Sequence, residues 1–348
     1  MSLHLDKDPW LAVNFSMFFP GIGQFYAGNY LRAILFFNGQ IFWLIMTGWN
    51  IFSAKGNTVT GFFYLGMAIL VYLSNILDAH LGVYYPRRQQ ILEKIPRKSK
   101  NLWFGIFVTR ILPGLGHLYL QKSVIGLGLL TATLILLSLN NIFPQLLLIT
   151  PLIAAIATYH TYHVFPHHSQ GKHRLIVAMA GIIFLLGVMG NYFPQWLDQR
   201  FEKFIIPSKS MQPTLQINDI VFVSKSANYV PQQKDIVVFT PSENIKVFDP
   251  DFSDYYIKRI IGTPGDVVEV KQGKVYINNQ PLQESYIAES PQYQWKSPTI
   301  PPNHYIVLGD NRNDSLDSHY WGLLPREVIV GKAYKIGWPP HRIQAIAP

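Results

Sequence analysis

The sequence predicts a multi-span helical membrane region followed by a mostly antiparallel β domain. Hydrophobic residues make up 49% of the 348 residues and charged residues only 14%, whereas an average soluble domain has about 25% charged residues. The long apolar runs end near Leu197. Beyond it, stretches rich in Val, Ile, Tyr and Phe are separated by Gly, Pro and Asn, a pattern typical of strands joined by turns. These stretches are 219–225, 235–241, 255–262, 266–282, 303–310 and 332–338.

The whole net positive charge of the chain comes from its apolar part. Residues 1–195 contain 13 Lys and Arg against 4 Asp and Glu, whereas residues 196–348 contain 16 of each class. A nucleic-acid-binding protein would carry its basic surface on the folded soluble domain, so we expect a lipid bilayer as a partner and no nucleic acid. The chain has no cysteine, which excludes disulfides, thiolate metal sites and a cysteine nucleophile.

Five apolar segments are predicted to cross the bilayer, which takes about 20 helical residues. They cover approximately residues 31–52, 60–84, 122–140, 142–165 and 175–194. Two more segments, 10–26 and 102–120, are interrupted by proline and glycine and are predicted as incomplete spans. The predicted domains are a first membrane repeat (1–100), a second membrane repeat (101–172), a last anchor (173–195) and the β domain (196–348).

The two interrupted segments form an internal repeat with an offset of 93 residues, in which a Pro-Gly-x-Gly-x-x-Tyr pattern recurs. The matching pairs are Pro20/Pro113, Gly21/Gly114, Gly23/Gly116 and Tyr26/Tyr119. This pattern resembles small two-span membrane modules with a PGxGxxY signature. Duplicated membrane units can form transporters, but we favour a structural role, because glycine permits tight turns and close helix packing.

Two basic loops set the predicted orientation. Residues 86–100 hold six Lys and Arg against one Glu, and residues 167–174 are also basic. Both loops are expected in the cytoplasm, because positively charged loops are retained there. Since two crossings separate them, the last span would carry the β domain to the extracytoplasmic face of the cytoplasmic (inner) membrane. Apolar residues after that span are expected to seat the domain on the bilayer: Trp196, Phe201, Phe204, Ile205 and Ile206.

The first candidate site segment of the β domain is a loop that contains Ser208 and Ser210. Pro207 and Pro213 flank it and fix the backbone φ angle on both sides. A serine on a rigid turn can act as a nucleophile, although most serines in such loops do not. The segment alone leaves both interpretations open.

The second segment is a strand with Lys258 and Arg259 among β-branched residues. If Lys258 points inward, desolvation lowers its pKa and leaves an amine that can accept a proton. Arg259 cannot serve as a base, because guanidinium stays charged in proteins. The alternative is an edge-strand lysine that extends to water.

The third segment, residues 309–322, is dense in acidic and amide side chains. It lacks the regular alternation and the terminal Glu of an EF-hand calcium loop. We interpret it as a polar turn whose side chains bond to each other and to the backbone.

In this order, the three segments resemble the bacterial type I signal (leader) peptidase family over about residues 190–340. The resemblance implies an antiparallel β catalytic domain next to the membrane. It implies that Ser210 is the nucleophile and Lys258 the general base of a Ser/Lys dyad. The Ser208 hydroxyl and the Ser210 amide would form the oxyanion hole, Ser315 would orient the base, and Asp317 and Arg312 would hold the active-site loop together.

The implied function is that of a membrane-bound serine endopeptidase that removes N-terminal signal peptides from translocated preproteins. Its substrates would carry small residues before the cleavage site, the secretion translocon would lie nearby, and no cofactor or metal is required. Two alternatives remain: a Ser/Lys peptidase dedicated to one secretion, pilus or conjugation precursor, and a non-catalytic membrane scaffold.

Two features depart from the family pattern. His319 stands where members commonly have Arg, and the duplicated membrane half exceeds the usual one or two spans. A Ser/His/Asp triad that uses His304, His319 or His341 is the competing mechanism. It is disfavoured for the adjacent pair Ser318 and His319, because neighbouring side chains usually diverge.

Overall fold

The structure, a computed structural model, describes residues 7–87, 100–139, 142–166, 172–226, 228–248 and 254–346. The chain divides into two compact units, Met1–Thr47 with Phe63–Trp196, and Gly48–Phe62 with Leu197–Pro348. Most of the basic loops at 86–100 and 167–174 lies outside the described residues, so the orientation inferred from them stays a prediction.

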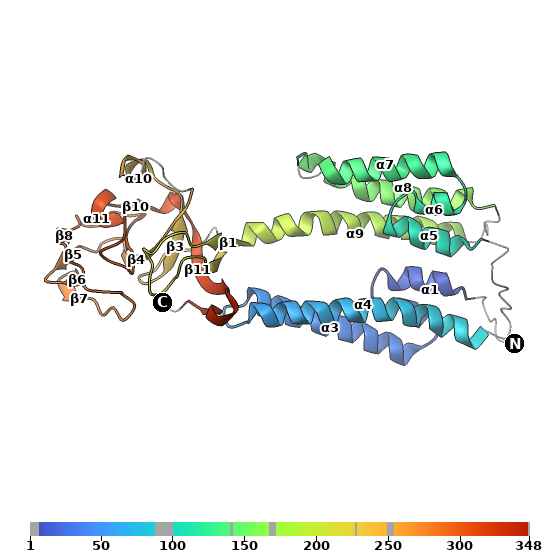
Figure 1. Cartoon of the computed structure of the whole chain (residues 1–348), viewed down its shortest axis with the longest axis horizontal. Helices are drawn as coiled ribbons and strands as arrows, with labels where there is room; N and C mark the ends of the chain where they lie inside the picture. Colours follow the sequence, from blue (N-terminus) through green and yellow to red (C-terminus); the bar gives the residue numbers. More distant parts are fainter. Residues whose placement is uncertain are drawn as a thin grey trace. The chain divides into compact units, whose positions relative to one another are not determined.

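Helices make up the chain up to Arg200 (Figure 1). In order they are α1 (Pro9–Ser16), α2 (Ile22–Ala27), α3 (Tyr30–Phe52), α4 (Thr58–Arg87), α5 (Leu102–Ile111), α6 (Leu115–Tyr119), α7 (Ser123–Leu139), the 3-10 helix η1 (Pro144–Leu148), α8 (Ile149–Val164) and α9 (His173–Arg200).

Four helical segments among the described residues are long and apolar enough to cross a membrane: Tyr30–Phe52, Thr58–Tyr85, Leu146–Val164 and His173–Arg200. The sequence predicted five. The fifth, α7, has 17 residues, which corresponds to about 25 Å of helix and falls short of a hydrocarbon core of about 30 Å. Asn140 and Asn141, two polar residues, follow it in the sequence.

Both interrupted segments are broken helices, because a glycine with positive φ separates each pair. Gly21 has φ +96° between α1 and α2, and Gly114 has φ +103° between α5 and α6. A side chain on Gly21 would come within 2.4 Å of the Ala33 carbonyl oxygen, and one on Gly114 within 2.3 Å of the Gly126 carbonyl oxygen. Only glycine fits both the backbone conformation and this close approach.

The tyrosines of the repeat also occupy matching positions. The Tyr26 hydroxyl accepts a hydrogen bond from the Asp8 amide at 3.0 Å, and the Tyr119 hydroxyl accepts one from the Asn101 amide at 2.8 Å. Asp8 and Asn101 are in turn the N-caps of α1 and α5. Tyr26 and Tyr119, 93 positions apart, therefore share the same local hydrogen bond as well as the same residue type.

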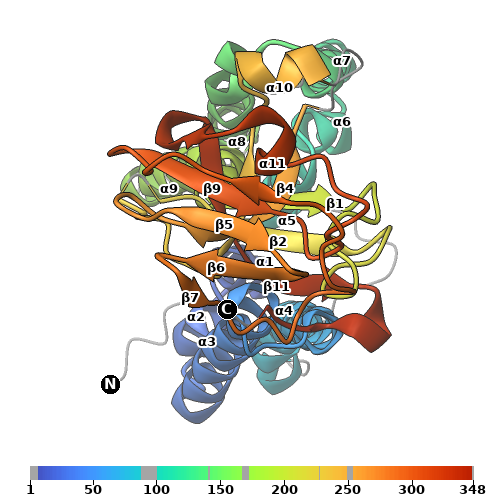
Figure 2. The same ribbon diagram turned by 90° about the vertical axis from the view of Figure 1, so that its left-hand side faces the viewer.

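Two antiparallel sheets form most of the rest of the chain (Figure 2). The larger has eight strands in the order β1-β2-β11-β3-β4-β9-β10, with β12 paired to β11; the smaller has the order β7-β6-β5-β8. The strands are β1 (Phe201–Ile205), β2 (Ile220–Ser224), β3 (Ile236–Phe239), β4 (Tyr256–Gly262), β5 (Val268–Lys271), β6 (Lys274–Ile277), β7 (Gln280–Pro281), β8 (Trp295–Lys296), β9 (His304–Leu308), β10 (Leu324–Pro325), β11 (Ile329–Trp338) and β12 (Gln344–Ala345). The short helices are α10 (Glu243–Phe248) and α11 (Ser318–Trp321), with 3-10 turns η3 (Arg326–Val328) and η4 (Pro340–Arg342).

The predicted fold class, apolar helices followed by an antiparallel β domain, is confirmed. Strand β3 shows why the larger sheet is stable, since all four of its residues are buried. Ile236 and Val238 contribute to one hydrophobic cluster, and Val237 and Phe239 to another. Apolar clusters therefore cover both faces of this strand, as the period of two along a strand requires.

The junction between the helices and strands differs from expectation. Helix α9 continues to Arg200, beyond the predicted end near residue 195, and β1 starts at the next residue. Phe201 and Phe204, expected on the bilayer, pair with β2, and Ile206 is buried in the β core. Ile205 does remain exposed. Trp196 is exposed as well, so of the five residues only Ile206 is buried, and their seating on a bilayer stays a prediction.

Candidate active site

Ser210 lies in the loop that connects β1 and β2. Pro207 and Pro213 flank it, and the Asn311 amide donates a hydrogen bond to the Ser210 carbonyl oxygen at 3.0 Å. The next side chain, Met211, is buried in a hydrophobic cluster. The loop is therefore held from several sides, and Ser210 is only 7% exposed.

Lys258 lies on β4, an inner strand between β3 and β9. Its side chain is 4% exposed. The Nζ atom lies 2.8 Å from Ser210 Oγ and 3.1 Å from the Ile257 carbonyl oxygen. The inward orientation considered from the sequence is therefore the one in the structure, and two residues that are 48 positions apart meet in one hydrogen bond.

Burial lowers the pKa of the Lys258 amine to about 8, while the carboxylates of Asp317 and Asp310 act in the opposite direction. A pKa near the working pH suits a general base, because the neutral form is then accessible. Once deprotonated, the nitrogen has a lone pair that can accept the Ser210 proton across the existing contact.

Ser208 lies on the other side of the nucleophile candidate. Its Oγ atom is 3.2 Å from Ser210 Oγ, and either oxygen can be the donor. The side chain is exposed and lines the same cavity as Ser210 and Lys258. A hydroxyl in this position can donate to an oxygen that develops negative charge beside Ser210.

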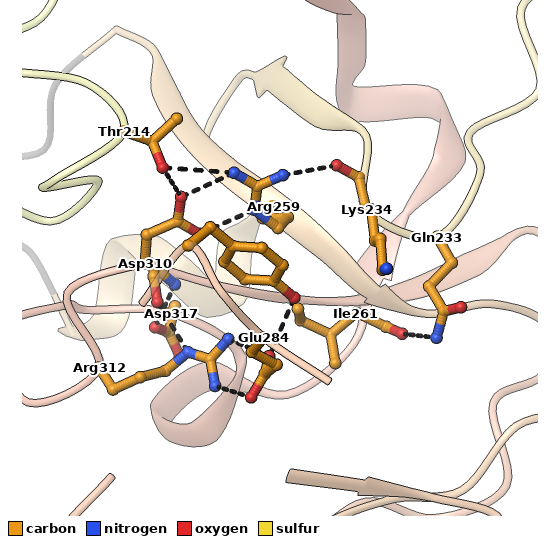
Figure 3. A network of polar contacts seen from close by, with 11 residues as sticks. Thr214, Gln233, Lys234, Arg259, Ile261, Glu284, Asp310, Arg312 and Asp317 are labelled. Carbon is orange, nitrogen blue, oxygen red and sulfur yellow. Dashed lines mark hydrogen bonds and ion pairs between the residues drawn. The ribbon is translucent and has the colours of Figure 1, made fainter. Parts of the chain in front are cut away.

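The loop that follows β9 is closed by Asp317, which caps α11. Its carboxylate accepts hydrogen bonds from the Gly309 amide at 2.9 Å and from the His319 amide at 3.2 Å. Arg312 closes the same loop from within: its Nε donates to the Gly309 carbonyl oxygen at 3.0 Å. The Arg312 guanidinium also forms a bidentate ion pair with Glu284, from outside the loop (Figure 3). The structure thus brings Asp317 and Arg312 together around Gly309.

Ser315 lies in this loop and lines the cavity, but it makes no contact with the lysine amine. Its Oγ atom is buried and has no hydrogen-bond partner among the described residues. The hydroxyl instead packs against Gly309, where an added Cβ would lie 2.2 Å from Ser315 Oγ and 2.4 Å from the Ser210 carbonyl oxygen. The expected hydrogen bond from Ser315 to Lys258 is therefore not formed in this structure, in which Lys258 Nζ contacts Ser210 Oγ and the Ile257 carbonyl oxygen.

Arg259, the neighbour of Lys258 on β4, forms a buried ion pair with Asp310. The Arg259 guanidinium is 1% exposed and binds both carboxylate oxygens of Asp310 at 2.8 Å (Figure 3). It also donates to the Lys234 carbonyl oxygen at 2.9 Å, and it stacks over the Tyr286 ring with 4.0 Å between guanidinium carbon and centroid. Thr214 completes the set by donating to Asp310. Arg259 is thus a fixed structural cation next to the titratable Lys258.

His319 occupies the position where an arginine was expected. Its Nδ1 atom lies 2.7 Å from the Asp317 carboxylate, and its ring stacks on Tyr293 with 4.1 Å between centroids. The Ser210 hydroxyl contacts Lys258 Nζ and Ser208 Oγ. The geometry therefore favours the Ser/Lys pair over the Ser/His/Asp arrangement.

A cavity of about 730 Å³ opens beside the two candidate catalytic groups. It is lined by Phe204, Ile205, Ile206, Pro207, Ser208, Ser210, Val238, Asp254, Tyr255, Tyr256, Ile257, Lys258, Asp314, Ser315 and Leu316. Apolar residues supply most of this lining, and Ser208, Ser315, Asp254 and Asp314 add polar groups beside Ser210 and Lys258.

The sequence of this chain is similar to those of known proteins. A model of the family described as signal peptidase, peptidase S26, matches residues 176–338. The signal peptidase I of Leptolyngbya laminosa is 46% identical over 145 residues, which cover 41% of this chain and 71% of that protein. The chain belongs to the signal peptidase I family. It is therefore a peptidase.

Two further signal peptidases are similar to parts of this chain. The probable signal peptidase I-2 of Synechocystis is 49% identical over 140 residues, covering 40% of this chain and 63% of that protein. A signal peptidase I from Enterococcus faecalis with a crystal structure is 31% identical, covers 30% of this chain and 97% of that chain, and has a TM-score of 0.26.

All the candidate site residues lie inside the segment matched by the signal peptidase family model, and helices α1 to α8 lie outside it. Sequence analysis missed Glu284 and the pairing of Arg259 with Asp310. Asp310 was visible in a polar loop, but nothing local connects it to β4, 51 residues away. Glu284 lies in a segment without any distinctive pattern.

Proposed function

We propose that this chain removes N-terminal signal peptides from translocated preproteins, with Ser210 as nucleophile and Lys258 as general base. The observation that carries the proposal is the 2.8 Å contact between Ser210 Oγ and a buried Lys258 Nζ. Membership of the signal peptidase I family supports the substrate class.

The reaction follows from the two groups. Neutral Lys258 takes the Ser210 proton while Oγ attacks the scissile carbonyl, and the lysine then protonates the leaving amine. The acyl-enzyme is hydrolysed when the same amine activates a water molecule. Ser208 and the Ser210 amide stabilise the oxyanion, and the loss of one such donor typically costs about 3–4 kcal/mol.

The neighbouring loop would keep the dyad in place. Asp317 and Arg312 hold residues 309–317 in a closed conformation beside Ser210. We propose that the Ser315 hydroxyl turns toward Lys258 during the reaction and orients the amine, since it lies in the same cavity with its hydrogen-bonding capacity unused.

The substrate is a peptide that leaves the membrane. Four long apolar helical segments among the described residues support membrane association of the chain. We propose a multi-pass protein of the cytoplasmic (inner) membrane, with its β domain on the extracytoplasmic face near the secretion translocon. A peptidase there meets the ends of translocated apolar segments, where signal peptides carry small residues before the cleavage site.

The matching geometry of the two broken helices leads to a proposal for the N-terminal half. We propose that α1 to α4 and α5 to α8 are two copies of one membrane module of the PGxGxxY type. The support is local: paired glycines with φ +96° and +103°, and paired tyrosine hydroxyls on the helix N-caps.

The decisive experiment is cleavage of a preprotein by the purified full-length protein in detergent. Ser210→Ala and Lys258→Met should each lower turnover by about 10⁴-fold or more, because nucleophile and base act as one unit. Lys274→Met, which changes an exposed lysine on β6, is the matched control and should cleave normally. Normal turnover by Lys258→Met would refute the dyad.

A further inference from the structure

A second buried lysine lies on strand β11, which β3 separates from β4 in the larger sheet. Lys335 is 0% exposed. Successive side chains on a strand point to opposite faces, and its neighbour Ile336 is buried as well, so both faces of β11 are covered here. The pairing of β11 with β2 shifts register between Ala333 and Lys335 and again between Ile336 and Trp338.

The partners of this lysine are backbone groups of the segment Gly48–Phe62, which belongs to the same compact unit as the β domain. Lys335 Nζ donates to the Asn50 carbonyl oxygen at 2.8 Å and to the Ile51 carbonyl oxygen at 3.1 Å. The neighbouring Tyr334 hydroxyl donates to the Phe52 carbonyl oxygen at 3.0 Å. Three consecutive carbonyls thus receive donors from two consecutive residues of β11.

These carbonyls are the ones that helix α3 cannot satisfy itself. An α-helix leaves its last four carbonyl groups without intrahelical partners, and α3 ends at Phe52. The Trp49 carbonyl accepts from the Ser53 amide at 2.9 Å. Lys335 and Tyr334 take the remaining three. A cationic amine is also favoured at this end by the partial negative charge of the helix C-terminus.

Aromatic rings surround the polar contacts. The Phe52 ring lies 5.2 Å from that of Phe201 on β1, and Phe201 lies 6.4 Å from the Tyr334 ring, measured between centroids. Lys335 Nζ is 5.8 Å from the centroid of the Phe222 ring. The rings exclude water from the amine, so loss of the carbonyl acceptors would leave a buried polar group without partners, which is costly.

We propose that the turn between α3 and α4 is a built-in docking element of the peptidase domain, bound through Lys335 and Tyr334. The docked segment lies outside residues 176–338, so the compact unit that holds the β domain includes an element that the family match does not contain. Ile336, the residue after Lys335, packs in the same hydrophobic cluster as Met211, the residue after Ser210.

Limited trypsin digestion of the full-length protein in detergent tests this docking. Lys55 is exposed in the turn, and cleavage after it requires the turn to open. The digestion uses the Ser210→Ala background, so its outcome does not depend on whether the chain is an active peptidase. Mass spectrometry of the fragments gives the rate of cleavage after Lys55.

Lys335→Met should raise this rate by about fivefold or more, because cleavage follows the population of the open form. Tyr334→Phe, which removes one hydroxyl and keeps the ring, should raise it by about two- to threefold. Lys274→Met is the matched control and should leave it unchanged. If Lys335→Met fails to fold, Tyr334→Phe decides alone.

A rise in either variant that Lys274→Met does not share supports docking. A rate equal to that of the parent protein in the variants that fold, or an equal rise in Lys274→Met, overturns it.

Discussion

Two lysines of the β domain, Lys258 and Lys335, are buried among the residues whose side chains the structure describes, and their polar partners differ. Lys258 meets a hydroxyl in a cavity, whereas Lys335 meets backbone carbonyls at the end of a helix. Burial lowers the pKa of both amines. A carbonyl oxygen has no proton to give, so Lys335 can only donate. Ser210 can give up a proton, so Lys258 can act as a base.

The comparison shows that desolvation alone does not identify a catalytic lysine. Desolvation makes the neutral amine accessible, but the chemistry depends on the partner atom. Arg259 adds a third case, a buried cation that is paired with the Asp310 carboxylate. The expected effects of changing these three residues differ in sign and size, and each one tests the comparison.

The largest effect on stability is expected from Arg259→Ala. This change leaves Asp310 as an uncompensated buried charge, which typically costs about 3–5 kcal/mol of unfolding free energy. Thermal melts of the purified protein should show a large fall in melting temperature. Lys296→Ala removes an exposed ion pair with Glu269, which water screens, and serves as the control. Equal small shifts would show that the Arg259 pair is not a structural support.

Lys258→Met is expected to stabilise the protein, whereas Arg259→Ala destabilises it. The folded-state pKa of about 8 lies below the ordinary lysine value of 10.5, so the unfolded chain binds an extra proton between these pH values and stability rises with pH there. At pH 7 the full cost is present, about 3 kcal/mol. The variant should therefore melt at a higher temperature than wild type at pH 7, and the gain should shrink toward pH 10.5.

Lys335→Met should destabilise the protein at pH 7, because its partner carbonyls lose their donors. Stabilisation by this variant as well would contradict the distinction between the two lysines.

The smallest expected effect is the change in kcat/KM for cleavage when the pH is lowered by one unit. The base must be neutral, and burial brings the pKa of Lys258 to about 8, so kcat/KM should fall about tenfold for each pH unit below 8. Wild type and Lys335→Met should share this profile in a preprotein assay. A profile with its maximum at pH 5, or a shift of the profile by Lys335→Met, would break the assignment of roles.

The order of elements in the β domain was predictable because strands carry a local signal. Each predicted strand segment overlaps an observed strand: 255–262 contains β4, for example, and 332–338 lies within β11. β1 was missed, since the aromatic residues of Phe201–Ile205 suit a bilayer surface as well as a strand. The broken helices were predicted from Pro-Gly-x-Gly, because positive φ is a local requirement with a residue signature.

The site was predictable only in part. Ser210 and Lys258 could be named from their segments, but their contact spans 48 residues and depends on the pairing of whole strands. The roles of Lys335 and Glu284 had no local signal, because their partners lie 285 and 28 residues away. Contacts of this kind are set by tertiary packing, which residue patterns do not encode.

The idle hydroxyl of Ser315 has a consequence for inhibitor chemistry. A compound bound in the cavity that offers one polar atom to this oxygen would gain a hydrogen bond without breaking one inside the enzyme. Such a bond is worth about 0.5–1.5 kcal/mol, up to roughly a tenfold gain in affinity. Analogues with and without that single atom would measure how much of this gain the pocket delivers.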